Sequence, residues 1–147
     1  MPPQKGLFKM EYLLNNCKVV PAVIPTAGSV AALTPVEVDG RGFSKALFII
    51  ATGAAATNGT LDAKVQKAAT SGGALADCTG AAITQLAAAT GASKVVAIDV
   101  TIDPAKPFMK ITGAVGTATF ANSVVCILYN GSGKYPNSAP ATEAVLA

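Results

Sequence analysis

The chain has 147 residues with 11 basic and 8 acidic side chains and no histidine, a length that suits one domain burying about 70% of its unfolded surface. The absence of histidine excludes Ser-His-Asp and Cys-His catalytic pairs and most catalytic zinc sites. Only 13% of the residues are charged, against about 25% in an average soluble domain, so we expect partner subunits to cover part of the surface.

Residues 1–16 precede the first strand-like segment, and we interpret them as an arm. The arm carries several large apolar side chains, so we expect it to lie on its own domain or on a neighbour. It lacks the uninterrupted apolar stretch of a secretory signal, and no apolar run in the chain approaches the ~20 residues needed to cross a bilayer. We therefore expect a protein made in the cytosol.

The next part of the chain consists of short β-rich runs separated by clusters of Gly, Pro, Asn and Asp. The first run, Cys17–Ile24, contains Pro21, which indicates an edge strand or a bulge. Residues 34–39 alternate apolar and polar side chains and predict a second strand. Residues 45–51 are continuously apolar, which predicts a central strand buried on both faces.

Residues 60–67 show the clearest alternation of the sequence, with Leu61, Ala63 and Val65 on one face. Asn58-Gly59, a strong hairpin signal, comes directly before this strand. Residues 83–86 fit either a further strand or a short helix ended by a glycine at position 91, and the neighbouring β pattern favours the strand.

The last part of the core predicts three more strands and their turns. Residues 94–103 alternate, residues 104–107 form a proline-containing turn, and residues 108–112 make a strand that a glycine-rich turn at 113–116 connects to the final strand, 118–129. About eight strands favour an all-β, antiparallel β-sandwich of jelly-roll type. We expect an N-terminal arm at 1–16, a sandwich domain at 17–130 and an extended C-terminal tail at 131–147.

The reactive side chains suggest no catalytic site. We interpret Cys17, Cys78 and Cys126 as free thiols, with Cys126 buried in an apolar strand and Cys78 near water but without an activating neighbour in the sequence. Asp99 and Asp103 lie roughly 13 Å apart along a strand, too far to share a proton. The basic residues are scattered, which argues against nucleic-acid binding. We predict no catalytic, metal-binding or cofactor-binding residues and no enzyme activity.

The order of several segments is similar to a known group of proteins. Residues 36–48 (VEVDGRGFSKALF), residues 58–66 (NGTLDAKVQ), residues 96–100 (VAIDV) and a closing apolar strand with a proline-containing tail resemble the small jelly-roll decoration, or cement, proteins of tailed-bacteriophage heads. The resemblance covers about residues 30–136.

This resemblance implies a virion protein that forms a homotrimer, binds the major capsid protein and assembles in the host bacterial cytoplasm, with no membrane as partner. The apolar terminal segments suit contacts between subunits, and we expect Phe8, Tyr12, Leu13 and Tyr135 to be the anchors. The alternatives are another virion component, such as a head-fibre or tail protein, and a carbohydrate-binding adhesin with the same fold.

Overall fold

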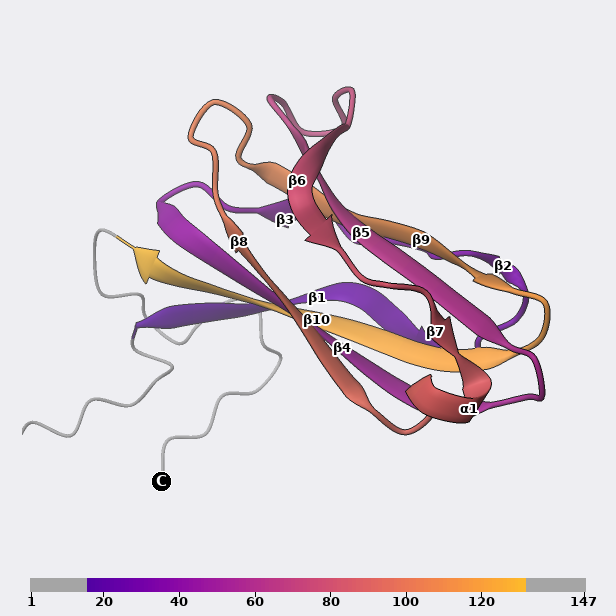
Figure 1. Ribbon diagram of the computed structural model, residues 1–147. Helices are drawn as coiled ribbons and strands as arrows, with labels where there is room; N and C mark the ends of the chain where they lie inside the picture. Colours follow the sequence, from indigo (N-terminus) through magenta and orange to yellow (C-terminus); the bar gives the residue numbers. More distant parts are fainter. Residues whose placement is uncertain (1–15, 132–147) are drawn as a thin grey trace, which may run out of the picture.

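A computed structural model describes residues 16–131, which form two antiparallel β-sheets packed face to face (Figure 1). The first sheet has the strand order β1 (Cys17–Thr26), β10 (Phe120–Gly131), β4 (Phe43–Ala55) and β8 (Val95–Thr101). The second has the order β2 (Ala31–Ala32), β9 (Phe108–Gly116), β5 (Thr60–Ala68) and β6 (Ala76–Ala82), with β3 (Val38–Asp39) paired to β9 and β7 (Leu86–Ala87) paired to β5. The all-β antiparallel sandwich predicted from the sequence is confirmed.

The strands of the first half of the chain pair with strands of the second half. The pairs β1 with β10 and β4 with β8 belong to the first sheet, whereas the pairs β2 with β9 and β5 with β6 belong to the second. Successive pairs along the chain therefore alternate between the sheets, as in a long hairpin that has been rolled up. The chain crosses between the two layers after β1, β3, β4, β7, β8 and β9.

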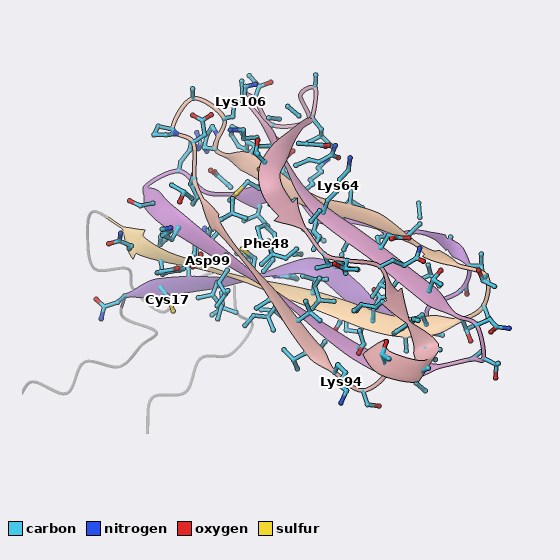
Figure 2. The ribbon with its side chains drawn as sticks, in the orientation of Figure 1. Cys17, Phe48, Lys64, Lys94, Asp99 and Lys106 are labelled. Atoms are coloured by element: carbon cyan, nitrogen blue, oxygen red, sulfur yellow. The ribbon has the colours of Figure 1, made fainter. Side chains whose placement is uncertain are left out.

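The core lies between the sheets and follows from the alternation of side chains along each strand. In β4, Ala46, Phe48 and Ile50 are buried against the second sheet, whereas Leu47 and Ile49 face away from it and are partly exposed. Within residues 16–131 the expectation that residues 45–51 are buried on both faces is not met, because β4 is central within its sheet but only two layers are described. Figure 2 shows Phe48 between the sheets.

The strand over residues 60–67 is confirmed, since Leu61, Ala63 and Val65 in β5 are all buried. The hairpin signal before it has a different role. Asn58 does adopt the left-handed conformation with a φ of 65°, but β4 and β5 belong to different sheets and do not pair. The turn therefore moves the chain from one layer of the sandwich to the other.

The glycine-rich turn expected at residues 113–116 is wrong, because β9 continues through all four of these residues. Gly113 lies opposite Ala63 in the ladder with β5, where a Cβ atom would stand 1.9 Å from the carbonyl oxygen of Asp62. Glycine is needed here for the close approach of two strands. The chain turns later, around Thr117, whose φ is 64°.

Two other segments differ from the sequence-based expectation. The strand expected at residues 34–39 is reduced to the two residues of β3, and residues 83–85 are irregular, followed by β7 and by the four-residue helix α1 (Ala88–Gly91). The described residues contain ten strands in place of about eight, because the sequence analysis did not predict the two-residue β2 or the seven-residue β6. No helix within residues 16–131 has the length and hydropathy needed to cross a membrane.

A buried threonine fixes the connection between α1 and β8. The hydroxyl of Thr52 in β4 donates a hydrogen bond to the carbonyl oxygen of Gly91 at 2.5 Å and accepts one from the backbone N–H of Lys94 at 2.9 Å. Thr52 is 9% exposed, so both bonds are largely shielded from water. Its side chain therefore holds the segment that carries the chain back from the second sheet to the first.

Candidate interaction surfaces

The first sheet has an unusually apolar face on the side that points away from the second sheet. The register of the four strands places apolar side chains of neighbouring strands next to one another on this face. We call it the apolar outer face, and it consists of Val19, Pro21, Leu47, Ile49, Ala51, Val95, Ala97, Val125 and Ile127. Within residues 16–131 no strand lies over it (Figure 1). A soluble protein rarely leaves such a continuous apolar patch in water.

Polar side chains border this face at one end. The hydroxyl of Tyr129 donates to both carboxylate oxygens of Asp99, at 2.9 and 2.8 Å, and the ammonium of Lys45 donates to the hydroxyl of Thr101 at 2.9 Å. The hydrogen bond to Asp99 raises the pKa of Tyr129, because it favours the protonated phenol. An apolar centre with a polar rim is typical of a surface that is covered in the native protein.

Cys17 is buried although its side chain belongs to this open side of the first sheet. It lies opposite Tyr129 in the ladder, so its side chain points to the same side as those of Tyr129 and Asp99. Figure 2 shows it at the free end of β1. Its exposed fraction is only 4%, and this burial raises the pKa of its thiol.

The outer face of the second sheet is polar, in contrast to that of the first. Its side chains form hydrogen bonds with one another, among them Lys64 and Gln66 with Asp77, Thr112 with Gln66, and Gln85 with Asp62. These pairs are exposed or partly exposed, so each contributes little to stability. They indicate a face that is solvated, and the two outer surfaces of the sandwich therefore differ in kind.

The two sheets also have free edges on the same side of the sandwich, at β6 and β8. In the described residues each of these strands pairs on one side only, with β5 and β4 respectively. Val95 in β8 is 69% exposed, the highest exposed fraction among the large apolar side chains described. A free edge with an exposed apolar side chain can accept a further strand or a neighbouring subunit.

Two shallow hollows lie between β6 and β8, with volumes of about 430 and 350 Å³. They share Gly80 and Asp99 in their walls, and none of the residues that line either one is aromatic. Sugar-binding sites usually stack an aromatic ring against the sugar. The composition of these walls does not favour the carbohydrate-binding alternative.

The structure brings one basic residue close to Cys78 that the sequence does not suggest. Lys67 lies near enough to favour the thiolate of Cys78, but its ammonium is paired with Asp103 at 2.9 Å. Burial outweighs this effect and raises the pKa of Cys78. Because its pKa is raised, Cys78 is mainly in the thiol form at neutral pH.

Each of the two carboxylates considered from the sequence has its own partner. Asp99 accepts from Tyr129, whereas Asp103 accepts from Lys67 and from the backbone N–H of Ala105. The bonds that Asp103 accepts lower its pKa. Across residues 16–131 there is no group of three Cys, Asp or Glu side chains that could hold a metal ion.

The anchors predicted from the sequence, Phe8, Tyr12, Leu13 and Tyr135, lie outside the described residues, so their contact with a neighbouring subunit stays a prediction. The apolar outer face was missed by the sequence analysis. Its signal is present in the continuous apolar runs of β4 and β10, where both alternating sets of side chains are apolar. This pattern indicates either a strand between two layers or a sheet with a further cover.

The sequence was compared with models of known protein families and with curated proteins, and neither comparison gave a match.

Proposed function

We propose that this protein is a non-enzymatic virion structural protein of the decoration or cement type, which binds the major capsid lattice of a phage head and stabilises it. The observation that carries this proposal is the strand order. Strand pairs that alternate between a four-stranded and a six-stranded sheet support a jelly roll, and the resemblance of residues 36–48, 58–66 and 96–100 implies that fold. We therefore take the sandwich to be a jelly roll.

The surface properties support a role in an assembly, which the fold alone does not establish. Only 13% of the residues are charged, and the edge strand β8 presents Val95 to solvent. Contacts of this kind are individually weak but are repeated around a symmetric particle. Many small interfaces then add up to strong binding, especially if the protein forms a trimer.

Binding to particles tests the proposal directly. The purified protein should form a trimer in solution, measured by light scattering, and should sediment with phage heads that lack it and make them more resistant to heat. Val95→Lys should weaken the co-sedimentation, because it places a charge at the free edge of β8. Leu75→Lys is the matched control, since Leu75 is exposed at 38% but lies in the connection before β6.

A monomer that does not sediment with any such head would contradict the proposal. Binding to fibres or tails in place of heads would favour another virion component, and binding to glycans would favour an adhesin.

A further inference from the structure

No described strand covers the apolar outer face, and a buried thiol, that of Cys17, lies at one corner of it. Cys17 lies at the beginning of an edge strand, on the side of the first sheet where no described strand packs. A side chain in such a place would normally be well exposed, yet Cys17 is only 4% exposed. The corner from which the N-terminal segment leaves the domain is therefore closed.

The sequence at this corner favours a reversal of the chain. Asn16 is in a turn directly before β1, and residue 15 is also an asparagine, the residue type that tolerates tight turns best after glycine. A reversal at this point would direct the preceding residues back over the first sheet. The continuation of the chain would then run across the apolar outer face.

Residues 7–14 have the pattern that such a cover requires. In an extended segment, alternate side chains point to opposite sides, which puts Phe8, Met10, Tyr12 and Leu14 on one side and Leu7, Lys9, Glu11 and Leu13 on the other. The first set is apolar apart from the hydroxyl of Tyr12, and the second contains both charges of the segment beside two leucines. One side thus matches an apolar sheet and the other matches solvent or a polar surface.

The length of the segment is also sufficient. Eight extended residues span roughly 26 Å, whereas four neighbouring strands have a width of about 14 Å between the first and the last. A tethered segment also has an effective concentration in the millimolar range near its own domain. Docking on the same copy is therefore favoured over docking on a second copy.

We propose that residues 7–14 lie across the apolar outer face of their own copy, with Phe8 and Tyr12 packed against the side chains of β10 and β4. The sequence analysis left two locations for the arm, its own domain or a neighbouring subunit, and this proposal assigns it to its own domain. Leu13 stays on the side that faces away from the sheet, where a neighbouring subunit can reach it. Neither assignment depends on whether the protein stabilises a phage head.

The reactivity of Cys17 tests the cover in the full-length protein. Cys78→Ser serves as the background, so that the remaining thiols are Cys17 and the fully buried Cys126. We expect Cys17 to react slowly with a thiol reagent, and deletion of residues 1–14 to accelerate this reaction by roughly tenfold or more, as for loss of local protection. Cys126 must stay unreactive, which shows that the sandwich is still folded.

Two double variants test whether the protection of Cys17 depends on the apolar side chains of residues 7–14 or only on the presence of the segment. Phe8→Ser with Tyr12→Ser should accelerate the reaction of Cys17 nearly as much as the deletion, whereas Lys9→Ser with Glu11→Ser should leave it unchanged. The inference is overturned if Cys17 reacts equally fast in the full-length and truncated proteins. It is also overturned if protection falls on dilution, which would place the segment on a second copy, or if deletion of the tail after residue 131 removes the protection.

Discussion

Gly113→Ala tests the position of β9 most directly, because the sequence places this glycine in a turn and the structure places it in the middle of a sheet. Gly113 lies opposite Ala63, between two paired strands. The added Cβ would stand 1.9 Å from the carbonyl oxygen of Asp62 and 2.9 Å from the Cα of Ala63. Both obstacles are backbone atoms, so no side chain can rotate away to make room.

The expected cost follows from what must move. An ordinary contact needs about 3.4 Å, so β5 and β9 must separate locally, which weakens one or two ladder hydrogen bonds at about 1 kcal/mol each and disturbs the packing next to them. We expect a loss of about 3 kcal/mol in the free energy of unfolding. Urea denaturation followed by circular dichroism measures this quantity.

Gly116→Ala is the matched control on the same strand. Its new Cβ would meet only the hydroxyl of Thr60, at 2.7 Å, and that side chain can change its rotamer. We expect a loss of at most about 1 kcal/mol. If Gly113→Ala costs no more than Gly116→Ala, the pairing of β9 with β5 described here is incorrect at this point and the turn predicted from the sequence regains support.

Three further results are expected. Thr52→Val should lower the free energy of unfolding by about 2 kcal/mol, since it removes a buried hydroxyl that both donates and accepts, and chemical denaturation would show this loss. The hydrogen bond to Asp99 raises the pKa of Tyr129. This bond therefore stabilises the fold below the unfolded pKa of about 10, and the stabilisation is lost as the pH rises through the folded pKa. Asp99→Asn should shift the ultraviolet titration of the Tyr129 phenol to lower pH. Burial raises the pKa of Cys126 to about 12, so a thiol reagent at neutral pH should modify Cys78 well before Cys126. Cys78→Ser should remove that early reaction. Equal reaction rates of the two thiols would contradict the burial of Cys126.

Elements with strict alternation could be predicted from the sequence alone. In β5 the apolar set of residues 60–67 alternates with polar side chains and lies in the core. In β8 the set that contains Ile98 and Val100 faces the core, although Val95 and Ala97 in the other set are also apolar. Pro21 likewise indicates an edge strand or a bulge, and β1 has both features: it is the end strand of its sheet, and its register shifts between Pro21 and Val23. In these segments the period of the side chains and the chemistry of proline determine the local structure by themselves.

Segments that depend on pairing could not be predicted in the same way. Gly113 has the residue type of a turn, but its place is decided by the backbone of β5, which is about 50 residues away in the chain. The hairpin signal at Asn58-Gly59 is similar, because the signal specifies a tight turn and cannot specify which strand the next one will join. The same holds for the lysine beside Cys78, which reaches it only through the folded sheet.

Composition and side-chain period act locally, so they were sufficient to predict the class of the fold, an antiparallel sandwich with few charged side chains. The contrast between an apolar and a polar outer face became evident from the pairing of the strands. Both alternating sets of side chains in β4 and β10 are apolar, and a strand cannot indicate whether a second sheet or some other segment will cover its outer set. That choice depends on the free energy of burying a whole face, which arises only when four strands distant in the sequence lie side by side.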